Sequence, residues 1–339
     1  MKINVLPAPT WNKLRVNETE AEIKSPLKQT EIFKQAPSGL KPISDERFGK
    51  IAGGLGGEFG AFLENSGAPA LSYETDGENG GVIGMNVDFS SGEGTGAARF
   101  NLKLGEGAER TVIQYISGEG KAAFENKFIL ENGSKLTLVQ VQTLDKNAEI
   151  YNDVGAVAGD NASFNLIQII LGGKDNYYGS LTCLEGEGSE VNTEIAYSMD
   201  SLRKLDMNYE SDHTGKGTAS AMKVNGVLKG EASKTFRGTI DFHRGCAGAV
   251  GSETEDVFLL DDTVINKTVP LILCDEEDVE GSHGATIGRA DESLLFYMAS
   301  RGIPEQEAFK LIERAKIDAV ASKIPDEKAA EIISGFLAE

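Results

Sequence analysis

The feature that most restricts the fold is a pattern that returns every 26 to 29 residues through the middle of the chain. Each occurrence begins with a glycine or an asparagine, continues with a small residue, and leads into residues that alternate between apolar and polar. The alternation indicates a β-strand with one face in a core and the other in water. Glycine and asparagine suit a corner where φ is positive. Successive occurrences begin at Gly107, Gly133, Asn161, Gly188 and Gly217.

A second short strand is expected about midway through each period, as in Glu149–Val154 and Gly179–Leu184. Two short strands per fixed period are typical of a solenoid, in which each coil buries its inward side chains against the next coil. A β-sandwich, which also has regularly spaced strands, is the alternative. Because the period stays close to 27 residues, we predict a β-helix over roughly 70–275, and hence a mainly β protein.

Both flanks of the predicted β-helix have the sequence character of helices. Residues 291–339 divide into three helical stretches, with Gly302 ending the first and Pro304 opening the second. A helix weakened by glycines is expected within 45–65. Because a solenoid has two open ends, we expect these helical flanks to cover them. The predicted division is an N-terminal helical segment (1–68), the β-helix core (69–276) and a C-terminal helical domain (277–339).

The charge balance disfavours several classes of partner. With 33 basic and 53 acidic residues, the chain has a net charge of −20, which opposes binding to nucleic-acid phosphates and to anionic membrane surfaces. No apolar run approaches the roughly 20 residues that a membrane span requires. The N-terminus also lacks the apolar stretch of a signal peptide. We therefore expect a cytoplasmic protein that binds neither nucleic acid nor membrane.

Three cysteines, Cys183, Cys246 and Cys274, lie far apart in the sequence. They form no C-x-x-C pair, so a structural zinc site is disfavoured, and their odd number argues against a disulfide framework. We expect them to be buried as small apolar side chains, Cys274 because it follows the apolar run Val269–Leu273. The sequence leaves open whether any of them has a redox or ligand role.

Four segments in the last third of the chain carry a resemblance to a known family. They are His213–Ser220, Ser233–Gly238, Asp278–Arg289 and Leu295–Ile303. Their patterns are H-x-G-x-x-(S/T), S-x-x-x-F-x-G, D-V-x-x-S-H-G-A-T-x-G and L-F-Y-x-x-S-R-G-I, in that order. The sequence thereby resembles the SufB/SufD family of iron–sulfur cluster assembly proteins across about 205–310.

The resemblance implies a fold, a set of partners and a task. Family members have a right-handed parallel β-helix between helical segments, and they pair through the C-terminal end of that β-helix, SufB with SufD or as homodimers. The C-terminal helices dock the ATPase SufC, and a transient iron–sulfur cluster is held at the subunit interface. Sulfur comes from a cysteine desulfurase, and flavin is a partner of some complexes. The resemblance thus implies a non-catalytic scaffold subunit of the SUF assembly complex.

Two positions favour the SufD branch of the family. His283–Thr286 reads H-G-A-T, as in SufD-like chains, where SufB-type chains have H-E-A-T. Glu255 occupies the position at which SufB-type chains carry a key cysteine, thirteen residues before the Thr268–Pro270 segment. Gly281 also stands where some SufD members have a cysteine. A carboxylate cannot replace a thiolate that accepts sulfur, so this chain is not expected to be the sulfur acceptor by itself.

Histidines are the candidate metal ligands, because a neutral imidazole can bind iron. By resemblance, His283 is a candidate iron–sulfur cluster ligand at the dimer interface; its alternative role is to bond a backbone carbonyl at the end of the solenoid. We expect His213 to be a structural corner residue bonded to the backbone. His243 lies close to Cys246 in sequence, which is compatible with a metal-binding pair, although a structural role for both is favoured.

The candidate partner-binding residues are Tyr297, Arg301 and Gly302, on the helix that resembles the SufC-docking element; simple packing is the alternative for Tyr297. The chain has no G-x-x-x-x-G-K-(S/T) motif, so ATP chemistry is assigned to a partner. Two other readings stay open: a β-helix enzyme acting on polysaccharides, and a homodimeric scaffold that replaces SufB. The sequence does not decide between a SufB-type partner and a second copy, nor does it give the cluster type or flavin binding.

Overall fold

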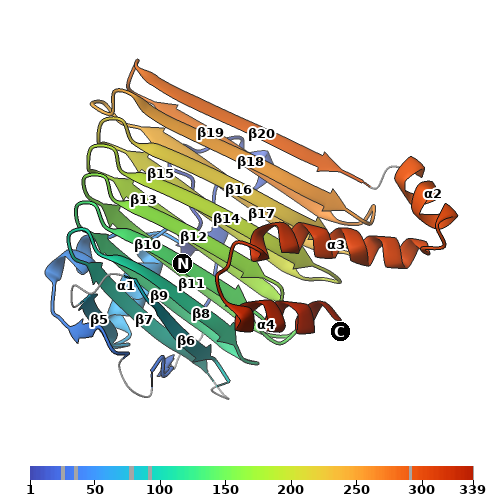
Figure 1. The fold of residues 1–339 in the computed structure, drawn as a ribbon, viewed down its shortest axis with the longest axis horizontal. Coiled ribbons are helices and arrows are strands. Elements are labelled where there is room, and N and C mark those ends of the chain that lie inside the picture. Colours follow the sequence, from blue (N-terminus) through green and yellow to red (C-terminus); the bar gives the residue numbers. More distant parts are fainter. Residues whose placement is uncertain (24–26, 34–36, 76–79, 91–93, 290–291, 339) are drawn as a thin grey trace.

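A parallel β-solenoid forms the body of the protein, as the repeat predicts (Figure 1). The chain alternates between two facing sheets, so that each coil contributes one strand to each sheet. Strands of successive coils pair in parallel, which confirms the predicted mainly β class and excludes the sandwich. The computed structural model describes residues 1–23, 27–33, 37–75, 80–90, 94–289 and 292–338.

From β5 onward, the even-numbered strands form one sheet and the odd-numbered strands form the other, which β3 and β4 also join. In the first sheet, the described strands are β6 (Val82–Asp88), β8 (Glu109–Ser117), β10 (Lys135–Gln142), β12 (Ser163–Ile170), β14 (Glu190–Met199), β16 (Ala219–Leu228), β18 (Ala249–Leu259) and β20 (Val279–Gly288). In the second, they are β3 (Leu27–Gln29), β4 (Leu40–Pro42), β5 (Ala70–Thr75), β7 (Thr95–Leu104), β9 (Lys121–Leu130), β11 (Glu149–Ala158), β13 (Asp175–Leu184), β15 (Lys204–His213), β17 (Ser233–Phe242) and β19 (Ile265–Cys274).

The repeat corners have the backbone that their residue types predict. Gly107, Gly133, Asn161, Gly188 and Gly217 all have φ between 53° and 70°, a region that favours glycine and tolerates asparagine. Because the corners recur at a nearly constant interval, positions one period apart stack on top of each other. The spacing of the corners therefore sets the register of the whole solenoid.

The core lies between the two sheets and is filled by ladders of stacked side chains. Phe128, for example, lies between Phe100 and Phe164, with ring centroids 6.4 Å and 5.7 Å away. All three rings are fully buried. Equivalent inward positions on successive strands therefore stack into one ladder. Each buried side chain contacts its counterpart in the next coil, so that neighbouring coils stabilise each other.

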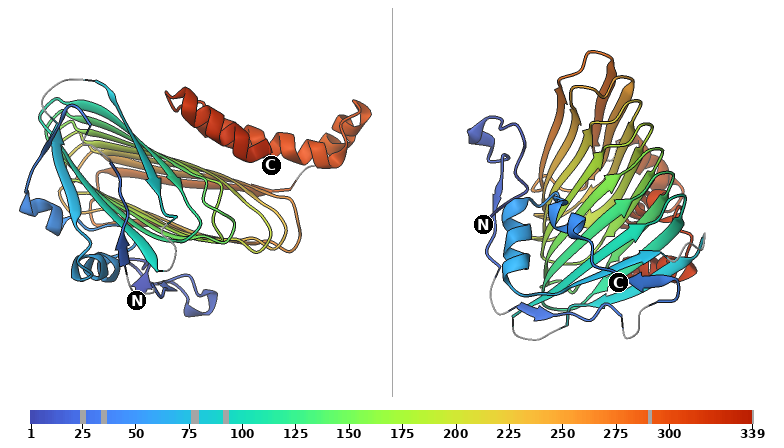
Figure 2. Two further views of the ribbon diagram at one scale, coloured as in Figure 1. Left: turned by 90° about the horizontal axis from the view of Figure 1, so that it is seen from below. Right: turned by 90° about the vertical axis from the view of Figure 1, so that its left-hand side faces the viewer.

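Helices α1, α3 and α4 cover the outer faces of the sheets and not the ends of the solenoid (Figure 2). Helix α1 (Gly57–Asn65) packs on the ten-stranded sheet, where Phe59 lies 6.3 Å from the ring of Tyr151. Helices α3 (Glu305–Ala321) and α4 (Glu327–Ala338) pack on the eight-stranded sheet. The expectation that helices cap the ends is wrong, because outward positions such as Ile113, Val139 and Ile167 already give that sheet an apolar outer face.

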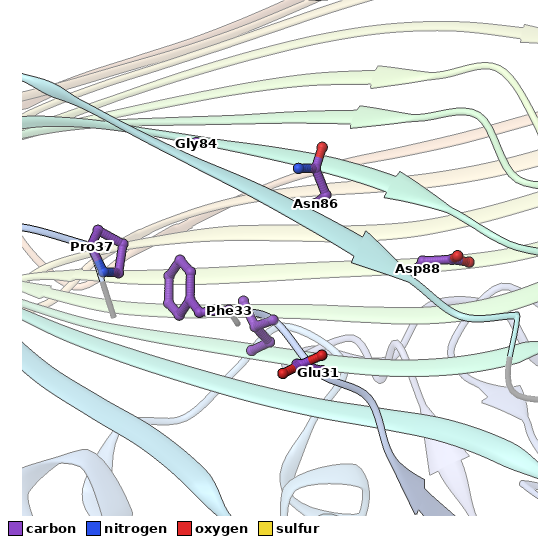
Figure 3. Close-up of a pocket in the computed structure, with 7 residues that line it drawn as sticks. Glu31, Phe33, Pro37, Gly84, Asn86 and Asp88 are labelled. Atoms are coloured by element: carbon purple, nitrogen blue, oxygen red, sulfur yellow. The ribbon is translucent and has the colours of Figure 1, made fainter. Parts of the chain in front are cut away.

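The first coil is closed by an extended segment from the N-terminal region. Ile32 and Leu40 are buried in the solenoid core, and Phe33 packs edge-on against Tyr73 and Phe100. A groove of about 830 Å³ remains between this segment and β6, and Figure 3 shows residues that line it, among them Glu31 and Asp88. Apolar side chains therefore cover the core at this end of the solenoid, although the outer edge of β6 has no described neighbour.

The flanking regions contain more than helices. Residues 1–68 hold α1 together with short strands and 3-10 turns: β1 (Lys2–Ile3), β2 (Thr19–Glu20), β3, β4, η1 (Asn12–Leu14) and η2 (Glu46–Lys50). Residues 277–339 begin with β20, and α2 (Glu292–Ser300) follows it. None of the helices in the described part of the chain has the length and apolar character needed to cross a bilayer.

Candidate functional site at the open end of the solenoid

The last coil, formed by β19 and β20, is unsealed. Among the strands that the structure describes, β19 pairs with β17 alone and β20 pairs with β18 alone. Their outer edges leave backbone N–H and C=O groups without a neighbouring strand, which is a template for pairing with another chain. Apolar side chains are exposed on both strands, with Ile265 54% and Ile287 45% accessible. We call these two edges and the side chains between them the open end.

His283 occupies an inward position of this last coil. Its Cα partner on β18 is Glu253, whose side chain is buried between the sheets, and Ala285 is paired in the same way with the buried Glu255. His283 itself is exposed because no further described coil covers it. An imidazole that lies on the core side of the strand yet is accessible to another molecule is suited to ligate a metal ion at an interface.

A buried ion pair lies directly beneath the open end. Lys234 on β17 contacts Glu255 on β18 across the core, and both side chains are fully buried. Thr268 on β19 links the two, since its Oγ1 donates to Glu255 Oε2 at 2.6 Å and accepts from Lys234 Nζ at 3.0 Å. Burial lowers the pKa of Lys234, and the charge of Glu255 opposes that shift. Glu255, which stands where SufB-type chains are expected to have a cysteine, is thus one member of a buried ion pair.

Glu253 adds a second buried carboxyl to this group. Burial raises its pKa to about 8, repulsion from Glu255 adds to the effect, and Lys234 opposes it. Its side chain fits because residue 238 is glycine: a Cβ at Gly238 would lie 2.4 Å from Glu253 Oε2. At neutral pH this carboxyl is therefore largely protonated and able to donate a hydrogen bond.

Replacing Glu253 by Gln is expected to stabilise the isolated chain at high pH and to change little near about pH 5. The pKa of Glu253 is about 8 in the folded chain, above the ordinary value of 4.5. The folded chain therefore loses stability as the pH rises from 4.5 to about 8, because the unfolded chain releases this proton first. The variant lacks this loss, and we expect it to be more stable by ~2–4 kcal/mol near pH 8. Urea unfolding at several pH values measures the difference. A difference that does not depend on pH would contradict the assignment.

The structure places the three cysteines in different environments. Cys246 is buried and Cys183 is half-buried, but Cys274 is exposed, so its expected burial is wrong. The apolar run before Cys274 belongs to β19, and none of the described residues forms a further coil that would cover this edge strand. Cys274 Sγ donates to the carbonyl of Glu276 at 3.0 Å.

The other two histidines lie away from His283 in the fold. His213 is buried, with Nδ1 2.7 Å from Thr218 Oγ1 and Nε2 2.8 Å from Ser220 Oγ. Burial lowers its pKa to about 4, which identifies a neutral structural residue bonded to hydroxyls and not to the backbone. His243 does not face the buried Cys246; its Nε2 lies 3.5 Å from Asp241 Oδ2.

The predicted partner-binding residues lie together on α2 and the turn after it. Arg301 stacks on Tyr297, with the guanidinium carbon 5.3 Å from the ring centroid. Gly302 has φ +83° and its N–H bonds the carbonyl of Ala299, as expected for a helix C-terminus. Phe296 is 77% and Tyr297 is 56% exposed, so α2 presents an apolar surface to solvent.

The fold and its open end define a class: a β-solenoid protein whose last described coil exposes backbone edges and the imidazole of His283. A sequence model described as the SufBD core domain of SUF system FeS cluster assembly matches residues 88–316, more than half of the chain. The chain therefore belongs to the SufBD family of iron–sulfur cluster assembly proteins.

Curated relatives agree with this family. The chain is 26% identical over 203 residues to the iron–sulfur cluster assembly protein SufD of Bacillus subtilis, covering 60% of this chain and 46% of that protein. It is 25% identical over 278 residues to a SufBD family protein of Mycobacterium tuberculosis, covering 78% and 68%. A chloroplastic SufBD family protein of Arabidopsis thaliana is 27% identical over 186 residues, covering 54% and 33%. The chain thus spans about half the length of its Bacillus relative.

Sequence reasoning missed the polar group beneath the open end. Glu255 was considered only as the replacement of a cysteine, and Lys234 and Glu253 were not considered. The signal was present in the alternation of the strand, because Lys234 shares a face with the apolar residues Phe236 and Ile240. An ionisable residue at an inward position of a solenoid strand requires a partner inside the core.

Proposed function

We propose that this chain is a non-catalytic scaffold subunit of a SUF iron–sulfur cluster assembly complex. It pairs with a SufB-type subunit, or with a second copy, through the open end, and it docks a SufC-type ATPase through its C-terminal helices. The observation that carries the proposal is the unsealed last coil, whose two strand edges lack a described neighbour. The transient cluster is the product under assembly, with sulfur from a cysteine desulfurase, and flavin is a further candidate partner of the complex.

Pairing through the open end is supported by hydrogen-bonding capacity and by burial. A second solenoid placed end to end would continue both sheets and satisfy the free backbone groups of β19 and β20. It would also bury Ile287, an inward residue that is exposed in the isolated chain. The same contact would enclose His283 between the two subunits.

The ligand chemistry at the open end favours a partner that differs from this chain. His283 supplies an imidazole, but the position for a sulfur-accepting cysteine is taken by Glu255, which is fully engaged by Lys234 and Thr268. Thiolates are the usual ligands of iron–sulfur clusters, and histidine ligation is the less common variant. A SufB-type partner would supply the missing thiolate, which is why we favour the heterodimer.

Docking of the ATPase is assigned to α2 because this helix is the most exposed of the C-terminal elements. Its Leu294, Phe296 and Tyr297 are exposed, whereas α3 and α4 bury Ile317, Val320 and Ile333 against the sheet. Aromatic side chains on an exposed helix are typical of binding hot spots. Deleting all three helices would uncover the apolar sheet face, so point variants on α2 are the appropriate test.

Co-expression of the tagged chain with SufB-type and SufC-type proteins tests both contacts at once. We expect wild type to recover both partners, and the double variant Phe296→Ala, Tyr297→Ala to lose SufC-type recovery by about tenfold or more while retaining the SufB-type subunit. The matched control is Leu202→Ala, which removes another exposed apolar side chain, 70% accessible, far from α2 in sequence. Equal recovery of the ATPase in both variants rejects the docking surface. Recovery of neither partner by the wild type rejects the scaffold role.

A further inference from the structure

A cluster of two aspartates and one histidine lies on the outer face of the ten-stranded sheet. Asp212 is on β15, Asp241 is on β17, and His243 follows the last residue of β17. One potential ligand atom from each side chain lies within 4.8 Å of the others, and His243 Nε2 is 3.5 Å from Asp241 Oδ2. We call these three residues the acid–histidine cluster.

The cluster is built by the register of the solenoid. Asp212 pairs with Asp241 across the β15–β17 ladder, and Cys183 on β13 pairs with Asp212 one coil earlier. The side chains therefore point from neighbouring positions of adjacent strands toward one place. His243 completes the group because it leaves β17 at its end, where the chain turns. Strand pairing, and not a mobile loop, holds the two carboxylates.

The arrangement of charges in the cluster favours a cation. Asp212 and Asp241 are paired on neighbouring strands, and His243 Nε2 lies beside Asp241 Oδ2. Carboxylates that are held close together repel one another, and a positive ion between them relieves that repulsion.

One buried oxygen of the cluster lacks a permanent hydrogen-bond donor. No partner is found for Asp212 Oδ1 among the described residues, and the neighbouring Glu210 can donate to Asp212 only while it is protonated. Buried carboxylate oxygens normally have a partner, because leaving one without a partner is costly. The adjacent Cys183 Sγ is 4.0 Å from Asp212 Oδ2, and burial raises its pKa to about 12, so it is a neutral neighbour.

We propose that Asp212, Asp241 and His243 bind a divalent transition-metal ion, with Zn²⁺ as the closest chemical fit. Imidazole nitrogen and carboxylate oxygen both ligate Zn²⁺, and water could fill the fourth position, whereas Mg²⁺ and Ca²⁺ prefer oxygen alone. Ligand atoms of one zinc ion lie about 3–4 Å apart. The His243 side chain is 41% exposed and is free to rotate by the small amount required. This site does not depend on the proposed SUF partners.

Zinc binding to the purified, metal-free chain tests the proposal, measured by competition with a chromophoric chelator. We expect one Zn²⁺ per chain and a dissociation constant at least about tenfold weaker in both His243→Gln and Asp241→Asn, with Mg²⁺ failing to compete. Thermal unfolding of Asp212→Asn is a second test. Without zinc, the variant should have a higher Tm than the wild type, because it removes one of two carboxylates that repel each other. With zinc, its Tm should not rise, whereas that of the wild type should.

Two controls separate this site from other donors. Asp175→Asn makes the same chemical change near the opposite end of β13, on the same sheet, and should leave zinc binding unchanged. The double variant Cys274→Ser, His283→Ala removes the exposed thiol and imidazole of the open end and should also bind Zn²⁺ normally. Loss of binding in this double variant with retention in Asp241→Asn overturns the proposal, and so does the absence of saturable binding in the wild type.

Discussion

Replacing Lys234 by Met is expected to lower the free energy of unfolding by about 3–5 kcal/mol. The change leaves Glu255 buried without its cationic partner, and Thr268 alone continues to donate to that carboxylate. Removing one member of a buried pair is costly because the remaining charge stays desolvated. Urea unfolding of the isolated chain at about pH 7, followed by far-UV circular dichroism, measures the loss.

Two variants establish that the loss comes from the uncompensated charge. Lys223→Met makes the same substitution at an exposed position of β16, and we expect a change within about 0.5 kcal/mol. The double variant Lys234→Met, Glu255→Leu removes both charges, and we expect it to recover most of the stability, because apolar replacements of a buried pair are often neutral. A loss below about 1 kcal/mol in Lys234→Met would show that the pair is of little importance.

Replacing His283 by Ala is expected to reduce cluster formation in the assembled complex by about tenfold or more while leaving the complex intact. His283 is exposed at the open end and is outside the buried ion pair, so its removal should not disturb the fold. The measurement is anaerobic co-purification with the SufB-type and SufC-type partners, followed by absorption spectroscopy and determination of iron and sulfide. Size-exclusion chromatography of the same sample verifies assembly.

The matched control is Ser282→Ala on the same strand, whose side chain lies on the other face of β20 because successive residues alternate. Both variants make a small change on β20, but only His283→Ala removes a nitrogen ligand. An unchanged cluster content in His283→Ala removes the ligand assignment and leaves the scaffold role standing. Loss of assembly in both variants would instead show that β20 tolerates no substitution at the interface.

Much of the fold follows from one periodicity. The corners at Gly107, Gly133 and Asn161 predicted a solenoid because their interval is nearly constant, and their positive φ values confirm the turns. The positions of the helices could not be predicted in this way. The sequence of an amphipathic helix such as α4 indicates an apolar face, but it does not indicate which surface that face packs against. That surface is a sheet face far away in sequence, with Val139 and Ile169 among its residues.

The site was predictable only in part. His283 was found through its resemblance to a family segment, and the structure places it at an exposed inward position that sequence alone could not establish. The exposure of Cys274 was missed because apolar flanks predict burial, whereas the burial of a strand depends on whether another coil follows. The acid–histidine cluster was missed because Asp212 and Asp241 are 29 residues apart in the sequence. Aligning the repeats would have placed them side by side.

The two ends of the solenoid differ, and this limits how large an assembly can grow. Ile32, Phe33 and Leu40 cover the core of the first coil, although β6 keeps an unpaired edge there, whereas no described residue covers the core side of the last coil at His283. Rods with two adhesive ends would polymerise into fibres, whereas rods with one such end stop at a pair. In the proposed pair, the covered core of the first coil would therefore oppose further end-to-end growth, so that the last coil can stay exposed without driving the protein into fibres.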